Sequence, residues 1–68
     1  MSEVWIARYM QYHSPGEAEC DTLEEAVSFL AWGQEAETLA AVEIVDPDGT
    51  VVLEGEELDQ AMDQCLGI

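Results

Sequence analysis

Residues 39–55 read LAAVEIVDPDGTVVLEG, and this stretch decides the fold that we expect for the chain. Residues 39–45 alternate well enough for a β-strand, and on one of its faces we expect Ala40, Val42 and Ile44, with Glu43 on the other. Asp46-Pro47-Asp48-Gly49 follows, with Pro at the second turn position and Gly at the fourth. This is the chemistry of a type I turn with a glycine bulge. The stretch therefore predicts a β-hairpin, with a second strand over Thr50–Glu54 that Gly55 breaks.

Amphipathic helices are expected before and after the hairpin. In the first helix, the Thr22 side chain can cap the first turn, and the Glu25 side chain can accept the backbone N–H of Thr22 in a capping box. Steps of about 100° place five apolar side chains on one face, namely Leu23, Ala26, Val27, Leu30 and Ala31. We expect Gly33 to end this helix. The second helix is expected from Glu56 to Leu66, closed by Gly67, with core spacing at Leu58, Ala61, Met62 and Cys65.

The N-terminal third supplies one more predicted strand, Val4–Met10, which is rich in β-branched and aromatic residues. The sequence Ser14-Pro15-Gly16 is typical of a loop, and we expect no regular structure between Tyr12 and Asp21. The predicted order is βαββα in a single α+β domain over residues 1–68. We expect a three-stranded sheet with two helices on one face, like a ferredoxin-like split βαβ unit lacking its last strand.

Two strand orders fit this pattern. A right-handed crossover through the first helix would make the first two predicted strands parallel. The third strand could then lie between them, antiparallel to both, or the second strand could occupy the middle of the sheet.

The charge balance restricts the function classes. Sixteen Asp and Glu residues face one Arg and no Lys, a formal net charge of −15. Affinity for bare nucleic acid or for an anionic membrane begins with Lys and Arg, so we expect neither as a direct ligand. No stretch approaches the roughly 20 apolar residues that span a bilayer. We expect a soluble cytoplasmic protein.

The sequence offers little for catalysis. The only His is His13 and the only strong cation is Arg8, and there is no Gly-rich phosphate loop, metalloprotease motif or nucleophile elbow. We expect no enzyme and no cofactor. Asp46 and Asp48 suggest calcium, but Gly49 comes too early for an EF-hand frame, so these residues are interpreted as a hairpin turn.

Two cysteines, Cys20 and Cys65, are expected to be free thiols, with Cys65 as a small buried apolar residue. A metal site could be composed of these two thiols with His13 and Asp21. It lacks the paired spacing that is typical of zinc sites, and we expect no metal.

The acidic side chains of the second helix are the most informative feature. Glu56, Asp59 and Asp63 fall along one stripe, and no Lys or Arg interleaves to neutralise them, as it would on an ordinary solvated face. Asp63 also lies near the end of the helix, where the dipole disfavours negative charge. The stripe is the predicted binding site for a basic protein partner, and we expect four further carboxylates to extend this negatively charged field: Glu24, Glu25, Glu35 and Glu37.

Three explanations of the acidity compete. The carboxylates can act as phosphate surrogates that occupy the basic groove of a nucleic-acid-binding protein. The protein can come from a high-salt cytoplasm, where acidity carries no specific function. It can also be an adaptor or an assembly module that charge keeps soluble. Salt dependence of binding distinguishes the first explanation from the third.

Apolar surfaces offer a second kind of docking site. Phe29 and Trp32 fall on the outer side of the first helix, although Trp32 could instead fold under residues 33–38 while Phe29 packs at the helix edge. The sequence leaves open which face of the sheet the helices cover; in the first strand, one choice is that they cover Trp5, Ala7 and Tyr9. The opposite, uncovered face would then present Val4, Ile6, Arg8 and Met10. Either surface could hold a partner, or the sheet could form a homodimer.

The stretches Trp5–Tyr9, Asp21–Ala26 and Ile44–Val52 together resemble small acidic proteins encoded by actinobacterial phages. The resemblance covers about half of the chain. It implies an accessory phage protein that acts on host machinery, and it carries no functional residue to transfer.

Overall fold

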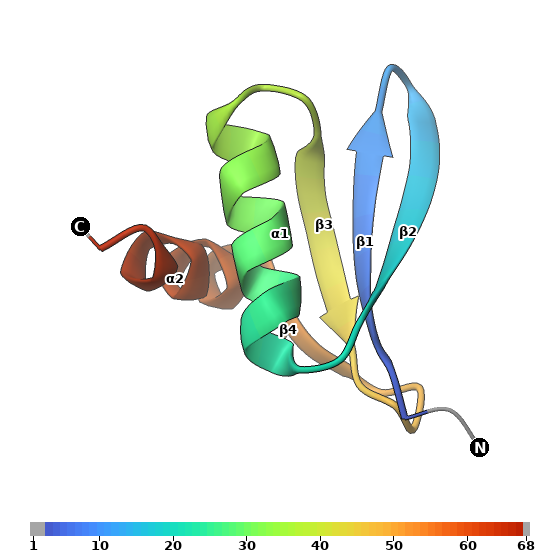
Figure 1. Ribbon diagram of the computed structural model, residues 1–68. Coiled ribbons are helices and arrows are strands. Elements are labelled where there is room, and N and C mark those ends of the chain that lie inside the picture. Colours follow the sequence, from blue (N-terminus) through green and yellow to red (C-terminus); the bar gives the residue numbers. More distant parts are fainter. Residues whose placement is uncertain (1–2, 68) are drawn as a thin grey trace.

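The computed structural model describes residues 3–67 and shows an α+β domain. Its elements are β1 (Trp5–Gln11), β2 (Ser14–Cys20), α1 (Leu23–Glu35), β3 (Ala40–Val45), β4 (Val51–Glu54) and α2 (Gly55–Cys65). The four strands form one antiparallel sheet in the order β2-β1-β3-β4. Both helices lie on the same side of this sheet (Figure 1). The chain is therefore two successive ββα units whose inner strands, β1 and β3, pair with each other.

The strand β2 corrects the expectation of an irregular segment between Tyr12 and Asp21. It pairs with β1 from Trp5↔Cys20 to Gln11↔Ser14. Its burial alternates toward Cys20, with Gly16 and Ala18 half-buried and Glu17 and Glu19 exposed. Pro15 is compatible with a strand here because β2 lies at the edge of the sheet, where no further ladder bond is needed. The sheet accordingly has four strands rather than three.

This additional strand also changes the strand directions. β1 and β3, the first two strands expected from the sequence, are antiparallel instead of parallel. The crossover helix α1 starts from β2, and both β2 and β3 run antiparallel to β1. A split βαβ arrangement is thus present, but its parallel strands are β2 and β3 with β1 between them. Between the two predicted orders, β3 rather than β4 occupies the middle.

A bulge in β3 moves one side chain away from its expected face. The register passes from Arg8↔Glu43 to Tyr9↔Ala41, which leaves Val42 without a partner on β1. Val42 is 42% exposed, whereas Ile44 is fully buried. The extra residue breaks the alternation. Ala40, which is exposed and pairs with Met10, also lies apart from Ile44, so the prediction that Ala40, Val42 and Ile44 share a face is wrong.

Helix α1 begins as expected and ends later than expected. The Thr22 hydroxyl accepts the N–H of Glu25 at 3.1 Å, and the Glu25 carboxylate accepts the N–H of Asp21 at 3.1 Å instead of that of Thr22. The helix continues through Gly33, because the left-handed residue that terminates it is Glu37, with φ of 59°. Gly33 serves packing instead: a Cβ there would lie 2.6 Å from the Leu39 side chain.

The predicted hairpin and second helix are confirmed. The Gly49 N–H donates to the Asp46 carbonyl at 3.0 Å with φ of 94° at Gly49, and the Asp46 carboxylate accepts the N–H groups of Asp48 and Thr50 at 3.0 and 2.8 Å. In α2, Leu58 and Met62 are buried. Cys65 is exposed and Cys20 is buried instead, so the expectation of a buried Cys65 is wrong.

One core lies between the sheet and the helices. It contains Ala7 and Ile44 from the sheet, Leu30 from α1 and Leu58 from α2, with Trp5 and Tyr9 packed against it. The helices therefore cover the face of β1 that carries Trp5, Ala7 and Tyr9, a choice that the sequence left open. Within residues 3–67, no helix is long and apolar enough to cross a membrane.

Candidate protein-binding surface

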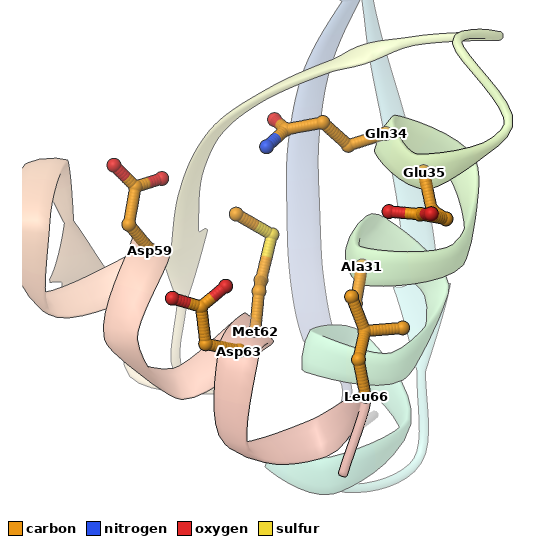
Figure 2. A pocket seen from close by; sticks show the side chains of 7 residues that line it. All are labelled: Ala31, Gln34, Glu35, Asp59, Met62, Asp63 and Leu66. Carbon is orange, nitrogen blue, oxygen red and sulfur yellow. The ribbon is translucent and has the colours of Figure 1, made fainter. Parts of the chain in front are cut away.

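A groove between α1 and α2 brings together carboxylates from both helices (Figure 2). We call it the acidic groove. It has a volume of about 390 Å³, and Glu35 lies on one wall with Asp59 and Asp63 on the other. Ala31, Met62 and Leu66 supply its apolar part, and Gln34 lies at its edge.

Burial of the neighbouring side chains of α2 keeps its two carboxylates at the surface. Leu58 and Met62 anchor α2 in the core, which leaves Asp59 and Asp63, one helical turn apart, at the groove. Gln34 is held by its own contact, because its side-chain oxygen accepts the N–H of Ala41 at 3.1 Å. The acidic groove is therefore built on two helices that are anchored in the core.

The remaining acidic residues of the predicted site lie elsewhere. Glu56 lines a different groove, at the start of α2, together with Glu43, Glu54 and Glu57. Glu24 lies beside Leu23 and Cys65, along another groove between the helices. Glu25 is engaged in the cap of α1. The predicted field is thus divided, and Glu35, which the sequence placed at its margin, belongs to its centre.

The positive charge of the domain lies on the outer face of the sheet. Arg8 donates from Nε to Glu17 at 3.0 Å and from Nη1 to Glu43 at 2.7 Å. These hydrogen bonds, to Glu17 first and then Glu43, raise the pKa of Arg8. Register places Glu17, Arg8, Glu43 and Glu54 in one row across β2, β1, β3 and β4. Within residues 3–67, no Lys or Arg is left to offset the carboxylates of the helical face.

Aromatic side chains lie next to this face. Trp32 is 59% exposed and lines a groove of about 450 Å³ with Tyr9, Phe29 and Leu39; we call this the aromatic groove. Phe29 packs at the helix edge against Tyr9, with ring centroids 5.6 Å apart at 57°, and stays 40% exposed. The alternative in which Trp32 folds under residues 33–38 is wrong, because most of its ring faces solvent.

Sequence reasoning missed a further surface at the tip of the β1–β2 hairpin. Tyr12 is 86% exposed, and both Tyr12 and His13 have positive φ, at 51° and 68°. A two-residue loop with both residues in this region is a type I′ turn, which favours Asn-Gly. Tyr12, His13 and Glu37 line a groove of about 500 Å³ between this hairpin and the α1–β3 loop, which we call the tip groove. The signal for it was hidden because residues 12–20 were not recognised as part of a hairpin.

The uncovered face of the sheet carries apolar groups in separate rows. Ile6, Val45 and Val51 are register partners, although Val45 is only 5% exposed and the exposed Glu19 pairs with Ile6 on β2; Met10 pairs with Pro15 and Ala40. The charged row through Arg8 lies between these two sets. Val4, which was predicted for this face, lies before β1 and is half-buried.

The two cysteines differ in environment. Burial, followed by the nearby charges of Glu25 and Asp21, raises the pKa of the Cys20 thiol. Cys65 is exposed and free. Among residues 3–67, the structure gathers no group of three or more His, Cys, Asp or Glu side chains that could hold a metal ion.

Comparison of the chain with protein-family models, with curated proteins and with solved structures finds no match. The surfaces described above are therefore interpreted from their own chemistry.

Proposed function

We propose that this domain binds a basic, nucleic-acid-binding protein of a host cell and inhibits or modulates it by phosphate mimicry. The observation that carries the proposal is the acidic groove, where Glu35, Asp59 and Asp63 converge from two helices with no Lys or Arg among them. A partner whose groove is shaped for phosphates meets the same sign of charge here and is steered by the same field.

The position of Asp59 and Asp63 supports a role in binding. Like charges one helical turn apart destabilise a helix, and the last turn of α2 contains no basic residue to offset the dipole. An arrangement that lowers helix stability and faces a groove is typical of a surface selected for binding.

The test begins with capture. The domain is immobilised, exposed to an actinobacterial lysate at about 50 mM salt, and the retained protein is identified and purified. Its affinity should fall steeply between about 50 and 200 mM salt, and competing DNA should displace the domain. A retained protein without a basic groove, or one that DNA does not displace, would contradict mimicry.

A matched pair of variants locates the contact. Asp59→Asn with Asp63→Asn removes two charges from the acidic groove and should weaken binding and flatten its salt dependence. The control, Glu19→Gln with Asp48→Asn, removes the same charge from exposed positions on β2 and in the β3–β4 turn. Equal losses in the two double variants would show that only net charge matters.

A second candidate function, an adaptor or a homodimeric module, is favoured by the apolar rows on the uncovered sheet face. Ile6→Asp would place a charge in the row of Val45 and Val51. If this variant abolishes dimerisation or partner binding while the melting temperature is retained, the sheet face is the interface.

A further inference from the structure

We infer that the partner is a protein that binds single-stranded nucleic acid, with Tyr12 and Trp32 of this domain in the place of unstacked bases. This inference rests on the proposed function. It deepens it by naming the kind of nucleic acid that the surface imitates.

The rings of Tyr12 and Trp32 are exposed to solvent. Tyr12 is 86% and Trp32 59% exposed, so neither owes its position to the core. Each ring lines an open groove, the tip groove for Tyr12 and the aromatic groove for Trp32.

The grooves that hold these rings adjoin the acidic groove through shared lining residues. Gln34 lines both the acidic groove and the tip groove. Gln11, Thr38 and Leu39 line both the tip groove and the aromatic groove. The three grooves therefore surround the end of α1, and a single partner can contact the acidic side chains and the rings at once.

Carboxylates next to exposed rings imitate a single strand better than a duplex. A duplex presents phosphates outward and keeps its base faces stacked, whereas a single strand presents phosphates and base faces together. Proteins that bind single strands combine a positive groove with aromatic and Arg side chains on which bases stack. Carboxylates beside solvent-exposed rings complement that groove in both charge and stacking, and an Arg of the partner can stack on Trp32.

The backbone at Tyr12 supports a role that is not structural. Bulky residues with positive φ are outliers, and such strain clusters at functional sites. Replacing Tyr12-His13 with Asn-Gly should therefore raise the melting temperature while it removes the ring.

The experiment uses the partner retained and purified as above. An oligothymidylate of about 20 nucleotides, longer than the site of one OB-fold, and a duplex of equal length compete with the full-length domain for this partner. We expect the single strand to displace the domain at a concentration at least tenfold lower than the duplex. If the duplex competes as well as the single strand, the inference is wrong and phosphate mimicry stands; if neither competes, the proposed function itself fails.

Variants give an independent readout. Trp32→Ala, and Tyr12→Asn with His13→Gly, should each weaken binding by about five- to one-hundred-fold, as loss of one stacked base does. The loss should be the same at low and high salt, unlike that of the Asp59→Asn, Asp63→Asn variant. Because the Asn-Gly turn is expected to fold better than the wild type, unchanged binding in that variant would overturn the inference even if Trp32→Ala misfolds.

Discussion

Neutralising Asp63 should stabilise the domain, although neutralising Glu24 should destabilise it. Both substitutions, Asp63→Asn and Glu24→Gln, remove one negative charge from an exposed position on a helix. Glu24 lies in the first turn of α1, where the dipole favours an anion. Asp63 lies in the last turn of α2 and one turn from Asp59.

The expected changes in the free energy of unfolding follow from these positions. A charge at a helix end is worth about 0.3–1 kcal/mol, and a like-charge pair one turn apart costs about 0.2–0.5 kcal/mol. Asp63→Asn should therefore raise the free energy of unfolding by about 1 kcal/mol, which corresponds to a rise in Tm of roughly 4–8 °C for a domain of this size. Glu24→Gln should lower the free energy of unfolding by about 0.5 kcal/mol.

Circular dichroism melts at low ionic strength measure both changes. Because the two variants have the same net charge, general repulsion predicts shifts of the same sign in both. Opposite signs that shrink together in high salt would support the argument from helix ends. If both Tm values rise equally, position on the helix is irrelevant and the case that Asp63 is kept for binding loses its basis.

Three further outcomes follow from the structure. Thiol reagents should modify exposed Cys65 before buried Cys20. Because the pKa of Cys20 is raised above its ordinary 9.0, the free energy of unfolding should fall as the pH rises past that value, and denaturation curves of Cys20→Ala should lack this pH dependence. Gly33→Ala should lower Tm despite the better helix propensity of Ala, because its Cβ meets Leu39, and should raise Tm when introduced into a Leu39→Ala background. Added salt should raise Tm by screening the net charge of −15, and a Tm indifferent to salt would show that the charges are already well dispersed.

Local chemistry made part of the fold predictable. The Thr22 cap and the Asp46–Gly49 turn depend on residues within four positions of one another, and both form. The start of α1 and the hairpin around the turn were therefore placed correctly.

Tertiary context decided the features that were missed. Pro15 and Gly16 are typical of loops, yet an edge position tolerates the former and the ring of Tyr9 lies over the latter. The bulge at Val42 is a feature of the pairing of β3 with β1, which the sequence of β3 alone does not show. The acidic groove was only partly predictable for the same reason: Asp59 and Asp63 share a helix face, but their meeting with Glu35 depends on how two helices cross.

The division of the chain into two ββα units has a consequence for the order of folding. Each hairpin joins strands that are neighbours in sequence, and such hairpins form in microseconds. The β1–β3 seam is the only strand pairing between the two halves, and across it Arg8 and Glu43 are 35 residues apart. An isolated two-stranded hairpin is marginally stable at best in water. The slow step should therefore be the joining of the two hairpins along this seam, and the entropy of closing the long loop between β1 and β3, more than any local propensity, should set the folding rate.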